Sequence, residues 1–311
     1  MPTRIFFNEV VTRDGFQNEP AFVETADKVA LIDELSQCGF AKIEVTAFVS
    51  PKAIPMLRDA EEVMGRITRR AAVQYTALVP NVRGAERALE ARADELNLVM
   101  SVSQTHNLAN LRMTREKSFA AIKEVVTQVN GQVPINVSLS TAFGCPMQGQ
   151  IELNEVMDWA RRFADLGVRG LTLCDTTGMA NPRQVRLFSD AVVSSLGRLE
   201  LTMHFHNTRG MGLANVLAAV ESGITSFDGS LGGLGGCPYA PGASGNICTE
   251  DTIHMLQTMG LETGVDLERL IHLARALPGL VGHPTPGQLA QAGRACDLHP
   301  VPEHVKAMLT H

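Results

Sequence analysis

The sequence predicts an α/β protein, a (β/α)8 TIM barrel with extra C-terminal helices. Short runs rich in β-branched and apolar residues alternate with amphipathic stretches, and eight such pairs in about 250 residues describe this barrel. No G-x-G-x-x-G fingerprint follows the first run, which argues against a doubly wound sheet. No linker or low-complexity segment divides the chain, so residues 1–311 are expected to form one domain.

The predicted elements follow one another in regular order. Residues 25–39 form a helix that opens on Thr25 as N-cap and closes on Gly39, and residues 154–168 form another. Residues from about 266 to 311 are expected to be a helical extension packed on the outside of the barrel. The predicted strands cover residues 5–10, 42–47, 73–78, 96–100, 135–139, 170–174, 201–206 and 226–231.

Composition and charge exclude several classes of function. The net charge of −6 gives no support to nucleic-acid binding, which usually leaves a basic stripe, and no apolar run reaches the ~20 residues that cross a membrane. The N-terminus enters a strand-like run at once, so no signal or transit peptide is expected. The six cysteines form no C-x-x-C pair, and a reduced cytoplasmic protein is therefore expected.

Polar residues collect where the predicted strands end, and this is the end at which (β/α)8 enzymes carry their chemistry. Charges in apolar strands are costly unless they are paired or functional, so this gathering predicts an active site. The residues are Glu9, Arg13 and Asp14 at the first strand, Glu44 in the second, Asp175 in the sixth, His204 and His206 in the seventh, and Cys237 and Asn246 in the glycine-rich loop after the eighth.

Each of these residues also has a purely structural explanation. Glu9 and Glu44 could form a supporting ion-pair network with Arg13. Asp175, which precedes Thr-Thr-Gly, could cap a loop or a helix, and Cys237 could be a small inert residue in a turn. Only the combination of these residues favours a catalytic site.

The two histidines predict a metal site. His204 and His206 are two residues apart in a predicted strand, so their side chains face one point. Asp14 and the Asn246 carbonyl can join them around one divalent cation and leave positions open for substrate oxygens. This ligand set suits Mg²⁺ or Mn²⁺, and Zn²⁺, Co²⁺ or Fe²⁺ would also fit.

Several motifs carry a resemblance to a known family. They are RDGFQNE (13–19), IEVTAFVSPK (43–52), AFGCPMQG (142–149), GLTLCDTTGMANP (170–182) and GGLGGCPYAPGASGNICTED (232–251). From about Arg4 to Glu268 the chain resembles the 3-hydroxy-3-methylglutaryl-CoA lyases, which belong to the metal-dependent aldol and Claisen barrels. The isopropylmalate, homocitrate and citramalate synthases share the Arg-Asp and His-x-His elements. They typically carry a Gly-Glu-Arg type of sequence at the cysteine loop, so a synthase is the weaker interpretation.

The resemblance implies a reaction and roles for the residues. Such a lyase breaks the C2–C3 bond of a 3-hydroxyacyl-CoA and releases acetyl-CoA and a keto acid. Arg13 would stabilise the enolate charge, and Cys237 would protonate the enolate carbon or assist that transfer. His204 would act in proton transfer besides binding the metal, while Glu44 and Asp175 would organise Arg13 and the base. The side chain that acts as general base stays open.

The resemblance also implies partners and further contacts. The substrate is an acyl-CoA thioester, with no nucleic acid or membrane as partner, and the assembly is a homodimer or a higher homo-oligomer. The residues expected to bind the substrate are Gln17, Glu9, Thr172, Arg209 and Asn207.

The chain departs from the lyase pattern at the strand-seven loop. Family members commonly read His-x-His-Asp-Thr-Tyr-Gly, whereas Asn207 and Arg209 stand here in place of the aspartate and the tyrosine. The tail reads GHPTPGQ (282–288), where related enzymes carry basic residues. A lyase for another branched substrate, such as a citramalyl-CoA, is therefore an alternative. A barrel that binds metal and ligand without catalysis is a third and weaker interpretation.

Overall fold

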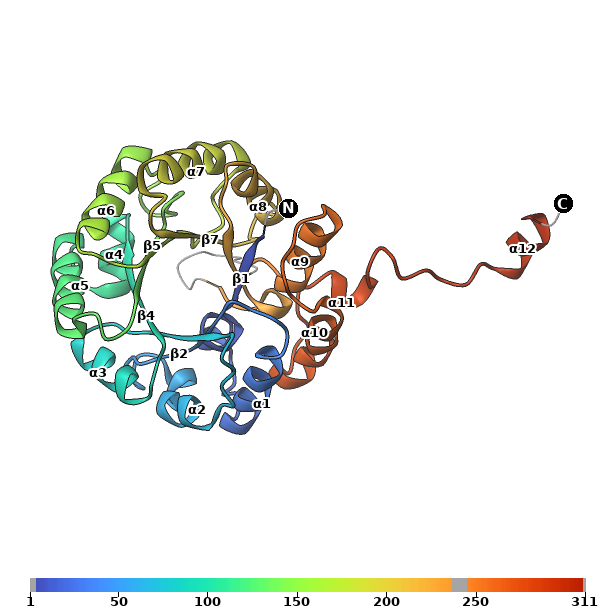
Figure 1. Cartoon of the computed structure of the whole chain (residues 1–311), viewed down its shortest axis with the longest axis horizontal. Coiled ribbons are helices and arrows are strands. Elements are labelled where there is room, and N and C mark those ends of the chain that lie inside the picture. Colours follow the sequence, from blue (N-terminus) through green and yellow to red (C-terminus); the bar gives the residue numbers. More distant parts are fainter. Residues whose placement is uncertain (1–3, 237–244, 310–311) are drawn as a thin grey trace.

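The computed structural model describes residues 4–236 and 245–309, and its core is a closed barrel of eight parallel strands. Each strand pairs with the next, and β8 pairs with β1. Figure 1 views the barrel from one end. The predicted fold class is therefore confirmed. The strands are β1 (Phe6–Glu9), β2 (Lys42–Ala47), β3 (Gln74–Leu78), β4 (Glu95–Ser101), β5 (Ile135–Ser140), β6 (Gly170–Asp175), β7 (Glu200–Phe205) and β8 (Ser226–Gly229).

Helices surround the barrel and cover its outer face (Figure 1). They bury the apolar, outward-facing strand residues such as Phe7, Val45, Leu98 and Phe205. The helices are α1 (Thr25–Leu35), α2 (Ala60–Arg66), α3 (Val82–Glu90), α4 (Gln104–Leu111), α5 (Arg115–Val129), α6 (Leu153–Asp165), α7 (Pro182–Leu196), α8 (Gly212–Glu221), α9 (Thr249–Thr258), α10 (Leu267–Val281), α11 (Leu289–Ala292) and α12 (Glu303–Leu309).

The bounds predicted for the first helix are wrong at both ends. Glu24 is the N-cap residue, and Thr25 lies inside the helix, where its hydroxyl donates to Asp59 Oδ2 at 2.8 Å. The helix ends at Leu35, and Gly39 belongs to the loop that follows. A Cβ at Gly39 would lie 2.2 Å from the carbonyl oxygen of Gly264, so this glycine permits a close approach of two loops.

The interior of the barrel is polar. Because side chains alternate along a strand, every second residue projects into the barrel. Near the N-terminal end, Lys42 pairs there with Glu95 at 2.7 Å and with Glu200 at 3.1 Å. A small internal cavity is lined by Asn8, Val10, Lys42, Glu44, Thr76, Glu95, Asn97, Asn136, Thr172, Thr202 and Asp228.

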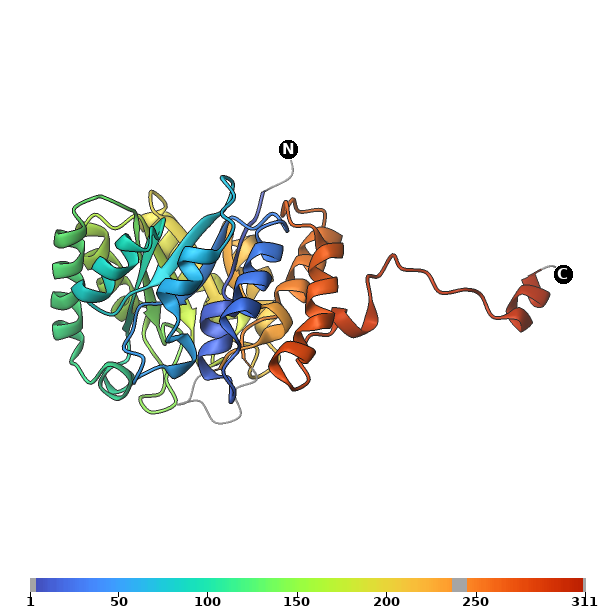
Figure 2. The same cartoon turned by 90° about the horizontal axis from the view of Figure 1, so that it is seen from below.

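The C-terminal segment only partly follows the barrel. Helices α10 and α11 pack beside α9, and α10 also contacts α1. The residues just after α11 still contact the body, since Ala295 N donates to His254 Nε2 of α9 at 3.2 Å. Beyond Asp297 the chain leaves the barrel, and α12 lies well away from it (Figures 1 and 2). Leu298 is 92% exposed and Met308 is 74% exposed. The tail expected to pack as a whole therefore packs only as far as Asp297. No helix in the described ranges is long and apolar enough to span a bilayer.

This arrangement predicts that the end of the chain is dispensable for stability. Ending the chain after Asp297 should change the free energy of unfolding by less than about 0.5 kcal/mol, because the removed side chains bury little surface. Ending it after Asp266 should prevent cooperative folding, because α10 buries Leu270, Ala274 and Leu277. Urea unfolding followed by circular dichroism measures both variants, and a clear loss of stability in the shorter deletion would contradict the prediction.

Candidate active site

The residues predicted to bind the metal lie at the C-terminal mouth of the barrel, together with Arg13. After β1 the chain makes a short π-helical turn, Val11–Gly15, which carries Arg13 and Asp14. His204 lies near the end of β7, and His206 follows the strand and forms an isolated bridge with Asn246. The loops after strands one, seven and eight therefore meet at one place.

Asp14, His204 and His206 form a compact buried group. One ligand atom of each lies within 4.8 Å of the others. The Nε2 atoms of His204 and His206 face each other at 3.1 Å, so a single proton can stand between them. Asn246 Oδ1 is buried without a hydrogen-bond partner in the described part of the chain, while its Nδ2 donates to Asp14 Oδ2 at 2.7 Å. Two imidazole nitrogens, a carboxylate and an unpartnered amide oxygen fit the donor set of a divalent cation.

The charges of this group also suit a cation. Burial raises the pKa of Asp14, but the charges of Arg13, His204 and His206 outweigh that effect and lower it to about 2. Burial, together with the charge of His204, lowers the pKa of His206 to about 3. At neutral pH Asp14 is therefore an anion and His206 is a neutral imidazole, which are the states in which these side chains bind metals.

Arg13 is fixed between two carboxylates. Its Nε and Nη2 atoms each lie 2.5 Å from Glu44 Oε2, and its Nη1 lies 2.5 Å from Asp14 Oδ1. Glu44 is held in turn by Asn97, whose Nδ2 donates to Oε1 at 2.8 Å. Burial lowers the Arg13 pKa, but the negative charges of Glu44 and Asp14 more than offset this and raise it. The result is a permanent cation with a fixed orientation beside the metal-ligand group.

Glu9 does not join this ion-pair network. It follows Asn8, which lines the barrel interior, so the alternation of β1 turns Glu9 to the outer face. Its Oε1 accepts from the backbone nitrogens of Val11 and Leu231, both at 2.9 Å. Glu9 therefore ties the turn that carries Arg13 to the loop after β8. Burial is the main cause that raises its pKa to about 8.

The two carboxylate oxygens of Asp175 differ in their surroundings, because one caps a loop and the other makes no hydrogen bond to the described residues. Its Oδ1 accepts from the backbone nitrogens of Met179 at 2.7 Å and Ala180 at 3.1 Å, as expected of a loop cap. Its Oδ2 is buried and has no hydrogen-bond partner among the described residues. Burial raises the Asp175 pKa to about 6 against the opposing effects of these two bonds and of the positive charges of His204 and Arg209.

Two of the expected substrate-binding residues point into the site or the barrel. Gln17 Nε2 donates to Asp14 Oδ1 at 2.9 Å, so Gln17 borders the metal-ligand group. Thr172 lies deeper in the barrel interior, where its hydroxyl accepts from Asn136 Nδ2 at 3.0 Å. Thr172 is therefore part of the polar lining below the mouth.

The strand-seven loop uses its polar side chains to hold neighbouring backbone. Arg209 Nη1 donates to the carbonyl oxygens of Thr177 at 3.0 Å and Gly178 at 2.8 Å, which joins the loops after β6 and β7. Asn207 Oδ1 accepts from Gly212 N at 3.0 Å, at the start of α8. In this structure both side chains shape the mouth of the barrel.

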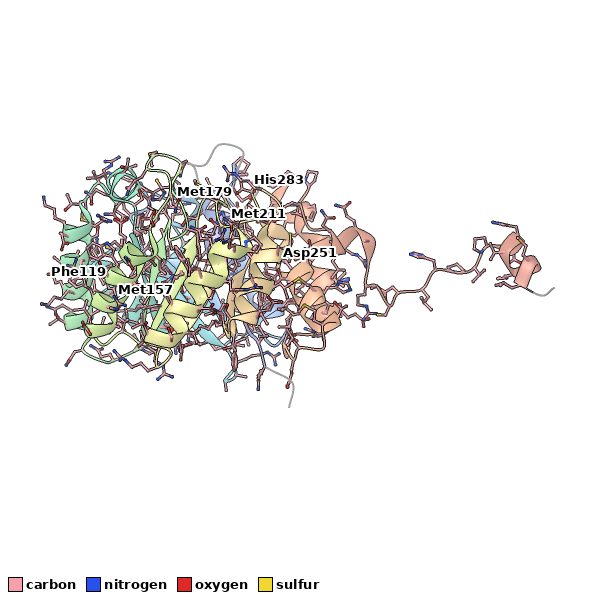
Figure 3. All side chains as sticks on the ribbon, turned by 90° about the horizontal axis from the view of Figure 1, so that it is seen from above. Phe119, Met157, Met179, Met211, Asp251 and His283 are labelled. Atoms are coloured by element: carbon pink, nitrogen blue, oxygen red, sulfur yellow. The ribbon has the colours of Figure 1, made fainter. Side chains whose placement is uncertain are left out.

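Other segments gather at the same end of the barrel. Figure 3 shows Met179, Met211 and His283, from the segments after β6, β7 and α10, toward the same end of the molecule. His283 Nε2 lies 2.6 Å from Glu19 Oε2, so the C-terminal segment is tied to the loop after β1. Cys237, the expected proton donor, lies outside the described residues.

The family model described as HMGL-like matches residues 4–277. The chain belongs to this family. A hydroxymethylglutaryl-CoA lyase of Bacillus subtilis is 43% identical over 291 residues, which cover 93% of this chain and 97% of the relative. An (R)-citramalyl-CoA lyase of Chloroflexus aurantiacus is 36% identical and covers 92% and 93% of the two chains. The family predicted from the motifs is confirmed.

A solved structure resembles this HMGL-like barrel along its whole length. It is an HMG-CoA lyase from Acinetobacter baumannii in complex with coenzyme A and 3-methylmalate. The two chains are 55% identical, the TM-score is 0.92, and the match covers 96% of this chain and 98% of the other.

Sequence reasoning missed two polar residues of this HMGL-like site. Asp228 on β8 lies beside His204, with Oδ2 3.3 Å from Nδ1, and Asn97 on β4 supports Glu44. Asn97 is a polar residue in a mostly apolar, buried strand. That pattern is the signal that could have found it, because such residues are costly unless they are paired or functional. Asp228 lies in the short strand Ser-Phe-Asp-Gly, which carries no such signal.

The raised pKa of Glu9 predicts how stability depends on pH. In the unfolded chain its pKa is near the ordinary value of 4.5, and in the folded protein it is about 8. Between these values the folded state binds more protons, so the contribution of Glu9 to the free energy of unfolding falls as pH rises. Its slope is at most about 1.4 kcal/mol per pH unit.

Glu9→Gln should remove this slope, because the amide oxygen can still accept from Val11 and Leu231 without titrating. Urea unfolding at several pH values between 5 and 8 measures the difference from the wild type. Glu62→Gln, at an exposed ion pair with Arg66, is the matched control and should keep the wild-type slope. Equal slopes for Glu9→Gln and the wild type would show that Glu9 is ionised throughout this range.

Proposed function

We propose that the protein is a metal-dependent carbon–carbon lyase. It cleaves the C2–C3 bond of a branched 3-hydroxyacyl-CoA, with 3-hydroxy-3-methylglutaryl-CoA as the leading substrate, to acetyl-CoA and a keto acid such as acetoacetate. The observation that carries the proposal is the Asp14, His204 and His206 group, which lies next to the fixed Arg13 cation at the mouth of the barrel. The HMGL-like family membership supports it.

Asp14, His204, His206 and Asn246 would hold the divalent cation. When bound there, the cation would act as a Lewis acid and lower the pKa of a substrate hydroxyl. The neutral His206 and the anionic Asp14 are ready to bind it at neutral pH. Mg²⁺ or Mn²⁺ is the proposed ion, because the nitrogen and oxygen donors suit an ion that keeps exchangeable waters; Zn²⁺ and Co²⁺ are alternatives.

The other side chains supply charge and proton transfer. Arg13 stabilises the negative charge that develops on the thioester oxygen as the C2–C3 bond breaks, and Glu44 holds its guanidinium in position. Asp175 accepts the hydroxyl proton through its unpartnered Oδ2, since a pKa of about 6 leaves it ionised at neutral pH. His204 assists that transfer. Cys237 returns a proton to the enolate carbon, which completes acetyl-CoA.

Citramalyl-CoA is the second candidate substrate. The citramalyl-CoA lyase of Chloroflexus aurantiacus is 36% identical to this chain, which supports the same bond cleavage on a closely related thioester. Gln17 and Thr172 are proposed to contact the acyl portion. Asn207 and Arg209 are proposed to influence the choice of substrate through the shape of the mouth, since both side chains hold its loops.

The protein is also proposed to act in the cytoplasm as a homodimer or a higher homo-oligomer, in the catabolism of leucine. Sedimentation velocity measures the assembly. A monomer at micromolar concentration would contradict the oligomer but would leave the lyase proposal in place.

A panel of 3-hydroxyacyl-CoA thioesters tests the function. The purified protein with Mg²⁺ or Mn²⁺ should release acetyl-CoA from 3-hydroxy-3-methylglutaryl-CoA or citramalyl-CoA, with the products read by mass spectrometry. Consumption of acetyl-CoA with a 2-oxo acid would instead identify a synthase, and no turnover in either direction would indicate a binding protein.

His206→Ala should lose metal affinity and turnover while the fold persists. His283→Ala removes a histidine outside the metal-ligand group and should keep metal affinity.

Arg13 variants test the role of the fixed cation. Arg13→Lys should lower kcat at least about tenfold with a smaller change in KM. The single ammonium group of a lysine cannot contact both Glu44 and Asp14 as the planar guanidinium of Arg13 does. Arg13→Met should lower kcat further. Steady-state kinetics measure both variants, and Arg66→Lys on the exposed surface is the control. A lysine variant as fast as the wild type would contradict the orientation argument.

A further inference from the structure

Three neighbouring strands place Asn8, Asp228 and His204 in one layer of the barrel interior. The parallel register pairs Asn8 of β1 with Asp228 of β8, and Asp228 with His204 of β7. Residues in register on adjacent strands point to the same side of a sheet. The three side chains therefore point into the barrel, and His204 joins this layer to the metal-ligand group.

The hydrogen bonds in this layer converge on the Asp228 carboxylate. Asn8 Nδ2 donates to Asp228 Oδ1 at 2.9 Å, and Asp228 Oδ2 lies 3.3 Å from His204 Nδ1. A carboxylate oxygen accepts hydrogen bonds, so the contact with Asp228 Oδ2 places a proton on His204 Nδ1. In the neutral imidazole that proton leaves Nε2 as a lone pair, and Nε2 is the atom that faces His206 at 3.1 Å.

We propose that Asp228 is a positioning residue, which holds His204 in the tautomer and ring orientation that present Nε2 to the divalent cation. The inference rests on the proposed function, because it takes His204 as a metal ligand. A carboxylate behind a metal-binding histidine increases the basicity of the imidazole, and loss of such a carboxylate typically weakens metal binding about 10- to 100-fold.

Asn8 makes the proposal testable, because its hydrogen bond determines which side-chain atom of a substituted residue 228 faces Asn8 and which faces His204. Its Oδ1 is buried without a partner in the described part of the chain. Rotating the Asn8 amide by half a turn would place its NH2 group where Oδ1 now lies, buried and without an acceptor. Asn8 therefore keeps Nδ2 toward residue 228. In Asp228→Asn the new amide oxygen therefore accepts from Asn8, and the new amide nitrogen faces His204 Nδ1.

This orientation reverses the tautomer of His204. With a donor opposite Nδ1, the ring has to accept there and carry its proton on Nε2, which blocks the nitrogen that faces the cation. Asp228→Asn should therefore weaken Mn²⁺ binding about 10- to 100-fold. Isothermal titration calorimetry of the metal-free protein with MnCl2 measures this dissociation constant without any substrate.

Exchanging the two residues should reverse the effect. In the double variant Asn8→Asp with Asp228→Asn, the carboxylate at position 8 accepts from the amide nitrogen at position 228. The amide oxygen at position 228 then accepts from His204 Nδ1 again. The side chains of the layer keep their total charge and differ little in volume, so Mn²⁺ affinity should return most of the way to that of the wild type. A purely structural need for a carboxylate at position 228 would leave the double variant as weak as the single one.

Glu95→Gln is the matched control, since Glu95 is another carboxylate inside the barrel but pairs with Lys42 at the opposite end. It should bind Mn²⁺ as the wild type does. Unfolding temperatures of the metal-free variants verify that each is folded.

Wild-type affinity in Asp228→Asn, or no recovery in the folded double variant, would overturn the positioning role of Asp228. Failure of the wild-type protein itself to bind Mn²⁺ would be a different result, because it would overturn the metal site on which this inference depends.

Discussion

Charges inside the barrel have to be neutralised by other side chains, because helices and strands exclude bulk water from them. This constraint organises the whole interior. Lys42 is balanced by Glu95 and Glu200 at the N-terminal end, and Arg13 is balanced by Glu44 and Asp14 at the mouth. The functional residues at the mouth are therefore continuous with a polar interior that extends along the barrel. They do not form an isolated polar patch above an apolar core.

The need to neutralise buried charges also gives neighbouring carboxylates different pKa values. Arg13 and the two histidines keep Asp14 ionised, whereas Asp175, with weaker compensation, has its pKa raised to about 6. Two aspartates in one site can then take different roles, one as a metal ligand and one as a group that exchanges protons near neutral pH.

Much of the site was predictable because strand periodicity is a local property. His204 and His206, two residues apart, were expected to face one point, and their ligand atoms do converge with that of Asp14. Asp228 was not found, because its importance depends on the register between β7 and β8. The resemblance to the lyases predicts Glu9 among the substrate-binding residues. The alternation of β1 directs it outward, to backbone that is distant in sequence.

By itself the sequence determined the barrel class, the family and the set of polar residues at the strand ends, since each depends on residue types and short spacings. The tertiary structure alone decided which carboxylate faces which cation, that Arg209 holds the backbone of a neighbouring loop, and that the chain beyond Asp297 leaves the barrel. Those features depend on which residues meet across the closed barrel. Partners far apart in the chain leave no periodic signal in the sequence.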